Sequence, residues 1–139
     1  MPIDKELTGR IIGAAIAVHK ELGPGFIESV YEEALAAEFD FQGIKYERQR
    51  VVAINYRAKK VGEHRLDFLV EDSVVVELKA VLSLEKIFFV VTRSYLKATG
   101  KQIGLLFNFA SMPLTVKRIS PEDLNYLNDH SSVPEFLLK

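Results

Sequence analysis

The sequence contains no cysteine. This absence excludes a disulfide framework, a thiolate metal site and catalysis by a cysteine nucleophile, and it fits a cytoplasmic protein. The sequence also lacks any apolar run near the ~20 residues that a membrane-spanning helix requires, and charged residues flank its short N-terminal apolar stretch. We therefore expect neither secretion nor membrane insertion.

An overall excess of positive charge is also missing, because the net charge is −1 and the pI is near 6.3. These totals do not favour a globally basic nucleic-acid binder. The bases are nevertheless concentrated, since residues 45–65 contain seven Lys or Arg and two Asp or Glu. The seven are Lys45, Arg48, Arg50, Arg57, Lys59, Lys60 and Arg65. They predict either a surface that meets phosphates or an ordinary solvated pair of strands. His64 beside them could lie near Asp67 and contact phosphate, but a strand-surface position is the favoured interpretation.

The length of 139 residues and the hydrophobic content of 48% predict one folded domain that spans residues 1–139. Apolar positions at steps of three or four predict helices over residues 3–22, 27–41 and 84–99, and Pro121 suggests a last helix from Ser120. Strand-like runs occupy residues 45–57, 63–70, 74–80, 102–110 and 114–119, with breaks at Lys59-Lys60 and at residues 71–73. This order predicts an α/β protein with a central mixed β-sheet flanked by helices.

Glu77 and Lys79 end a strand that is otherwise apolar, "VVVELK". If residues 71–73 form a three-residue loop, Val70 lies opposite Val74, and Asp67 lies opposite Glu77. Alternation then places Asp67, Glu77 and Lys79 on one face of the hairpin. The other face is wholly apolar and consists of Leu66, Phe68, Val70, Val74, Val76 and Leu78.

Two opposed carboxylates repel each other, so the pair formed by Asp67 and Glu77 predicts a cation between them. A divalent ion such as Mg²⁺ satisfies this requirement, because it takes one or two protein carboxylates and receives phosphate oxygens as further ligands. The ammonium group of Lys79 satisfies it equally in an ordinary charged cluster. A register shift of one residue would separate the two acids, and the hairpin pattern alone leaves these alternatives open.

Asp67, followed after nine residues by Glu77-Leu78-Lys79, resembles the D…(D/E)xK signature of the PD-(D/E)xK nuclease superfamily. The segment "GFIESVY", residues 25–31, matches the G-x-x-E-x-x-Y motif of the GxxExxY family within that superfamily. The resemblance extends through "IIGAAIAVHKELGPGFIESVYEEAL", "VELKAV" and "YLKATGKQIGLLFNF", and so covers roughly residues 8–119.

This resemblance implies a restriction-endonuclease-like core in which Asp67 and Glu77 hold Mg²⁺ or Mn²⁺. It also implies that Lys79 is the catalytic lysine and that Glu28 is the acid that such enzymes place on an N-terminal helix. Two neighbouring carboxylates favour the charged form of Lys79, so we expect it to orient the attacking water and to stabilise negative charge.

Three further residues are candidates for substrate binding. Tyr31 shares a helix face with Glu28 and is expected to hydrogen-bond within the site. Tyr95 belongs to a Gln-x-x-x-Tyr pattern of such nucleases, in which Val91 occupies the Gln position of this sequence. Arg65 is the base of the positive segment that lies nearest to Asp67 along the chain.

Together these features predict a Mg²⁺-dependent nuclease that hydrolyses phosphodiester bonds of DNA with a metal-activated water. A homodimer is expected, since two sites are the simplest way to cut both strands of a duplex. The alternatives are a catalytically weak or inactive nucleic-acid-binding module and a protein-interaction module on the same fold.

Overall fold

Eight elements of secondary structure follow one another in the computed structural model, which describes residues 5–122. They are α1 (Lys5–Leu22), α2 (Glu28–Gln42), β1 (Tyr46–Tyr56), β2 (Lys59–Val70), β3 (Val74–Lys79), α3 (Lys86–Thr99), β4 (Ile103–Asn108) and β5 (Thr115–Ile119). The three helices and five strands occur in the predicted order. The last predicted helix, from Ser120, is not seen by Glu122, and its remainder lies outside the described residues.

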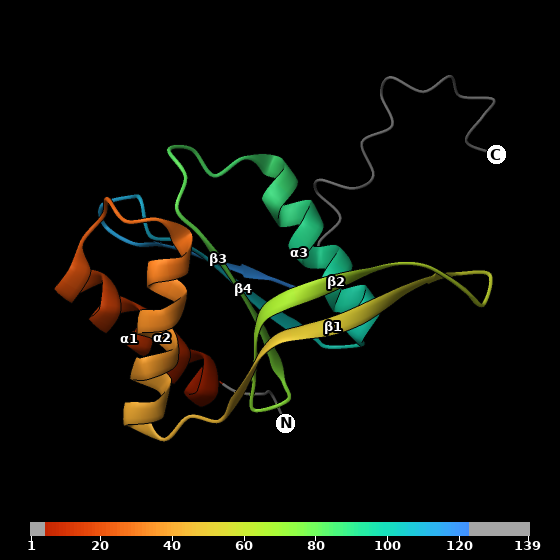
Figure 1. Ribbon diagram of the computed structural model, residues 1–139, viewed down its shortest axis with the longest axis horizontal. Helices are drawn as coiled ribbons and strands as arrows, with labels where there is room; N and C mark the ends of the chain where they lie inside the picture. The colour runs from red at the N-terminus through yellow and green to blue at the C-terminus, as the bar shows by residue number, and fades with distance from the viewer. Residues whose placement is uncertain (1–4, 123–139) are drawn as a thin grey trace.

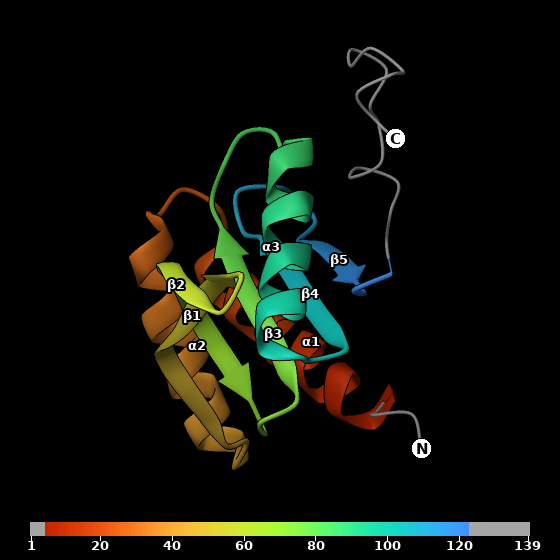
Figure 2. The same cartoon turned by 90° about the vertical axis from the view of Figure 1, so that its right-hand side faces the viewer.

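The five strands form one sheet in the order β1-β2-β3-β4-β5. Strands β3 and β4 are parallel, whereas the other neighbours are antiparallel. Helix α3 connects the parallel pair and covers one face of the sheet, and α1 and α2 cover the other face (Figures 1 and 2). The predicted mixed sheet with flanking helices is therefore confirmed.

Glycine residues follow α2 and α3, whose last residues lie within one residue of the predicted helix ends. Gly43 follows α2 with a φ of 73°, and its N–H donates to the carbonyl oxygens of Asp40 and Phe39. Gly100 follows α3 with a φ of 75° and donates to the carbonyl oxygen of Leu96. Glycine adopts this left-handed conformation without the steric cost that a Cβ atom would bring, so both helices stop there.

The turn between β1 and β2 lies at Arg57-Ala58 and not at Lys59-Lys60, where the sequence predicted a break. Arg57 and Ala58 have φ values of 50° and 63°, and Tyr56 pairs directly with Lys59. Two successive left-handed residues give a tight turn whose twist matches that of the strands. The prediction was wrong because Gly, Asn and Asp, the usual signals of such a turn, are absent. The resulting hairpin projects from the body of the protein (Figure 1).

The register of the β2–β3 hairpin agrees with the prediction. Val70 pairs with Val74 and Phe68 pairs with Val76 across a three-residue loop, in which the Ser73 N–H donates to the Val70 carbonyl at 2.9 Å. Phe68, Val70, Val74, Val76 and Leu78 all lie in the buried cluster beneath α1 and α2.

Leu66 is the exception to the predicted apolar face. It lies in the second buried cluster, with Val52 and Leu96, on the side of α3. Gln49, which lies between Arg48 and Arg50 on the paired strand β1, has a left-handed φ of 55°. This conformation turns β1, and β2 turns with it because the strands stay paired, so the strict alternation of faces ends near Asp67.

None of the helices within residues 5–122 is long and apolar enough to span a membrane.

Candidate active site

Asp67 and Glu77 approach each other where β2 and β3 separate. The β2–β3 pairing on this side ends at Phe68 and Val76. Beyond it, Asp67 Oδ2 accepts a hydrogen bond of 2.8 Å from the backbone N–H of Leu78. This bond ties the Asp67 carboxylate to the strand that carries Glu77 and Lys79. Besides burial, Asp67 also contributes to the raised pKa of Glu77, so the two carboxyl groups lie near each other. The direct pairing of Asp67 with Glu77 that the register predicted is not among the β2–β3 pairs.

Glu77 lies in an environment that disfavours its negative charge. Its side chain is 7% exposed, and its Oε1 atom is buried without a hydrogen-bond partner. Burial, reinforced by the neighbouring Asp67 carboxylate, raises the pKa of Glu77 to about 10. Glu77 is consequently neutral near pH 7 unless a cation compensates its charge.

His64 contributes to the same cluster. Its ring stacks on the Tyr95 ring of α3 with a centroid separation of 3.5 Å and an interplanar angle of 13°. Its Nε2 atom lies 3.9 Å from Glu77 Oε1 and is also buried without a hydrogen-bond partner. The interpretation of His64 as a strand-surface histidine is wrong, because the exchange of faces near Asp67 turns this part of β2 toward α3. Its position three residues before Asp67 was the available signal in the sequence.

Lys79 does not neutralise the two acids directly. Its Nζ atom lies 4.8 Å from the centroid of the Phe88 ring, a cation–π contact with α3. Among residues 5–122, no ion pair within 4.0 Å joins Lys79 to Asp67 or Glu77. The structure therefore does not support an ordinary charged cluster in which Lys79 forms ion pairs with both acids. The Lys79 ammonium group does lie within electrostatic range of Glu77.

Glu28 reaches the cluster from the other layer of helices. It is the first residue of α2 and is half-buried. Burial raises its pKa, Lys79 opposes this shift, and Asp67 adds to it. The positive end of the α2 helix dipole lies at the same position and favours an acid there. Glu28 and Lys79 thus influence each other although they come from different elements.

Tyr31 occupies a different place from the one expected. It is completely buried and stacks on Phe109 with a centroid separation of 4.6 Å. Its hydroxyl group donates to the Gly23 carbonyl at 2.6 Å and accepts from the Phe26 N–H at 3.2 Å. These contacts order the loop before α2 and do not support a direct substrate contact by Tyr31.

The other two substrate-binding candidates differ in exposure. Tyr95 is partly buried beside His64, and burial together with the charges of Glu77 and Asp67 raises the pKa of its hydroxyl group. Arg65 is exposed on β2 next to His64, and within residues 5–122 its side chain forms no hydrogen bond or ion pair. Of the two, only Arg65 presents a solvent-accessible charge.

The basic segment is partly neutralised within the protein. Arg48 pairs with Glu32 and Glu33 of α2, and this pairing raises its pKa further. Arg50 lies 3.5 Å from Glu47, and Lys60 lies 3.0 Å from Glu63. The uninterrupted face of seven bases that the sequence allowed is therefore not formed. Arg57, Lys59 and Arg65 keep their positive charge available along the projecting hairpin.

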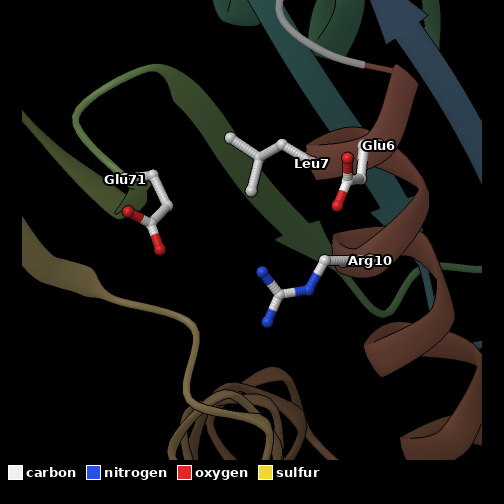
Figure 3. A pocket seen from close by; sticks show the side chains of 4 residues that line it. All are labelled: Glu6, Leu7, Arg10 and Glu71. Carbon is white, nitrogen blue, oxygen red and sulfur yellow. The ribbon is translucent and has the colours of Figure 1, made fainter.

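A pocket at the other end of β3 is separate from this cluster. Glu6, Leu7 and Arg10 of α1 and Glu71 of the β2–β3 loop line it (Figure 3). Arg10 donates to the Gln42 carbonyl at 3.2 Å, and Glu71 accepts from the Lys45 N–H at 3.1 Å. Arg10 thus joins α1 to the end of α2, and Glu71 joins the β2–β3 loop to Lys45 just before β1.

The donor atoms of Asp67 and Glu77 fit a hard divalent cation, which prefers carboxylate oxygens and keeps water or phosphate in its other positions. The unpartnered Glu77 Oε1 is the observation that supports this fit. Within residues 5–122, no three His, Cys, Asp or Glu side chains are grouped closely enough to hold a metal ion by themselves. Ligands from water or substrate would have to complete the coordination.

The protein has an α/β core of the nuclease type. This class is defined by the mixed sheet, by the crossover helix α3, and by Asp67, Glu77 and Lys79 on the adjacent strands β2 and β3. Residues 5–119 match the family described as the PD-(D/E)XK nuclease superfamily, and the chain belongs to that superfamily. Its architecture is accordingly restriction-endonuclease-like. A comparison with curated proteins finds no match.

The crystal structure of SSO0001 is similar in fold, with a TM-score of 0.55 and 16% sequence identity. The similarity covers 67% of this chain and 50% of that chain, so it spans half the length of that protein. It supports the fold alone.

Proposed function

We propose that the protein is a Mg²⁺- or Mn²⁺-dependent nuclease that hydrolyses phosphodiester bonds of DNA. One observation carries this proposal: Asp67 and Glu77 lie close together beside Lys79, and the buried Glu77 Oε1 has no hydrogen-bond partner. Membership of the nuclease superfamily supports the same reaction. The motif in residues 25–31 further suggests the GxxExxY family within it.

Asp67 and Glu77 would hold the ion. When bound, a divalent ion polarises the scissile phosphate and activates water for attack. The Leu78 N–H keeps the Asp67 carboxylate in place, which limits the reorganisation needed when the ion arrives. In this proposal the two carboxylates bind the ion. Lys79 and Glu28 act on the negative charge of the phosphate and on the orientation of the lysine side chain.

Lys79 would stabilise the negative charge that develops on the phosphate during attack. Its contact with the Phe88 ring holds the ammonium group without neutralising it by an ion pair. Glu28, which interacts electrostatically with Lys79 from α2, would fix the direction of this side chain. Lys79 is therefore the catalytic residue of the proposal, and Glu28 is a positioning residue.

The projecting β1–β2 hairpin would contact the DNA backbone. Arg57, Lys59 and Arg65 are exposed on it, and it leads away from Asp67 along β2. Phosphate contacts of this kind orient a nucleic acid but do not read its sequence. A homodimer would present two such sites to the two strands of a duplex.

Cleavage of duplex, single-stranded and branched DNA with Mg²⁺ or Mn²⁺ tests the proposal. Asp67→Ala and Lys79→Ala should each abolish cleavage. The matched control is Lys117→Ala, which removes an exposed lysine of β5 and should leave cleavage unchanged. Equal traces of cutting by the wild type and by Lys79→Ala would indicate a contaminating nuclease and would refute the assignment.

An inactive nucleic-acid-binding module is the second candidate, because Val91 of α3 replaces the Gln of the related pattern. Such a module would show DNA affinity that falls with salt concentration, no cleavage, and equal affinity in Asp67→Ala. A protein-interaction module would show no salt-dependent DNA affinity.

A further inference from the structure

Two buried polar atoms of the cluster lack partners and face each other. Glu77 Oε1 and His64 Nε2 are 3.9 Å apart, and neither makes a hydrogen bond. A buried polar group without a hydrogen-bond partner destabilises the folded protein. These two are the buried side-chain nitrogen and oxygen atoms without a hydrogen-bond partner within residues 5–122, and their position side by side indicates a ligand that binds both.

The separation of these atoms indicates the kind of ligand. A distance of 3.9 Å is too long for a hydrogen bond. Two nitrogen or oxygen atoms that bind one divalent ion at ~2.0–2.2 Å each lie up to about 4 Å apart. The measured separation is within this limit, so one ion could contact both atoms after a small adjustment.

The surroundings of His64 restrict its ring to this direction. The ring stacks on Tyr95 at 3.5 Å, and its side chain is 31% exposed. Glu77 lies on the central strand β3 and is nearly inaccessible. A ligand pair held by a stacked ring and a sheet loses little side-chain freedom when it binds an ion, which favours binding.

We propose that His64 Nε2 is a ligand of the divalent ion that Glu77 binds in the proposed site, and that the site therefore prefers a first-row transition metal such as Mn²⁺ to Mg²⁺. Within residues 5–122, His64, Asp67 and Glu77 are not already grouped as a three-ligand site, so the ion would have to draw these side chains together. The inference rests on the proposed function, because it adds a residue to that metal site. Its chemical basis is that Mg²⁺ favours oxygen ligands, whereas imidazole nitrogen binds first-row transition metals well.

Pulsed electron paramagnetic resonance of the Mn²⁺-loaded full chain tests the ligand directly. A coordinated imidazole produces a ¹⁴N coupling, and selective labelling with [¹⁵N]histidine identifies its source. His64→Phe keeps an aromatic ring against Tyr95 but removes the nitrogen atoms. His64→Gln is a second variant, with a polar side chain, should the first fail to fold as judged by circular dichroism.

We expect the ¹⁴N coupling in the wild type and its loss in both His64 variants. Calorimetric titrations should show Mn²⁺ affinity weakened by about tenfold or more, and Mg²⁺ affinity changed by less than about threefold. The role of His64 would be overturned if Mn²⁺ binding gave no ¹⁴N coupling, was lost in Glu77→Gln and was unchanged in His64→Phe. That result would leave the metal site of the proposed function in place. A wild type that binds neither ion would instead overturn the metal site of the proposed function.

Discussion

Replacing Glu77 by Gln should stabilise the metal-free protein, and the gain should grow with pH. The folded protein raises the pKa of Glu77 from its ordinary value of 4.5 to about 10, and burial is the main cause. Between these values the unfolded chain releases a proton that the folded protein keeps, so wild-type stability falls as pH rises. Gln has nearly the same shape and carries no charge at any of these pH values.

The structure sets the size of this effect. Each pH unit inside the window costs the wild type up to about 1.4 kcal/mol. From about pH 5 to about pH 7.5, the stability difference between Glu77→Gln and the wild type should therefore widen by about 3 kcal/mol. Such a change is a substantial fraction of the stability of a small domain, which is about 5–15 kcal/mol.

Urea unfolding followed by circular dichroism, in the presence of a chelator, measures this difference. Glu63→Gln is the matched control, because it removes an exposed carboxylate from β2, where solvent screens the charge. A saturating divalent ion should recover part of the wild-type stability near pH 7.5 and leave Glu77→Gln unchanged. A stability difference that stays constant from pH 5 to pH 7.5 would refute the neutral, buried Glu77.

Tyr31→Phe should destabilise the protein by about 1–3 kcal/mol in urea unfolding, because two backbone groups of the loop before α2 lose their hydroxyl partner; an unchanged midpoint would contradict this role. Glu28→Gln should reduce the rate of cleavage, because Glu28 acts on Lys79. The affinity for Mn²⁺, measured by calorimetry, should stay within about threefold of the wild-type value, because Glu28 does not bind the ion. An affinity loss as large as that of Asp67→Ala would make Glu28 a ligand. The double change Arg57→Gln and Lys59→Gln should weaken DNA binding and reduce the slope of log affinity against log salt by up to about 2. An unchanged slope would remove the hairpin from the DNA interface.

Local sequence signals predicted most of the secondary structure. Apolar positions at helical spacing and the glycines at positions 43 and 100 located α2 and α3 to within about two residues. The β2–β3 register followed from the three-residue loop and the apolar run around it. The approach of Asp67 to Glu77 lies beyond the last β2–β3 pair, Phe68 and Val76, and depends also on the hydrogen bond that the Leu78 N–H donates to Asp67.

Contacts between distant elements could not be predicted in the same way. Arg48 was a candidate for contact with phosphates, but in the folded protein it forms ion pairs with Glu32 and Glu33 of α2. Tyr31 proved to be buried because the loop after α1 supplies two backbone partners for its hydroxyl group. Residue types and spacing contain no information about which acid or carbonyl group will lie beside them in space.

By itself, the sequence determined the order of the elements and the register of the β2–β3 hairpin, because both depend on neighbours along the chain. It also identified Asp67, Glu77 and Lys79 as the residues of the candidate site. Only the tertiary structure decided that His64 lies against Tyr95 and faces Glu77. The left-handed backbone of Gln49 accompanies an exchange of strand faces near Asp67, and α3 then supplies the stacking ring. Such a change in direction depends on backbone conformation and packing together, which periodicity along one strand cannot reveal.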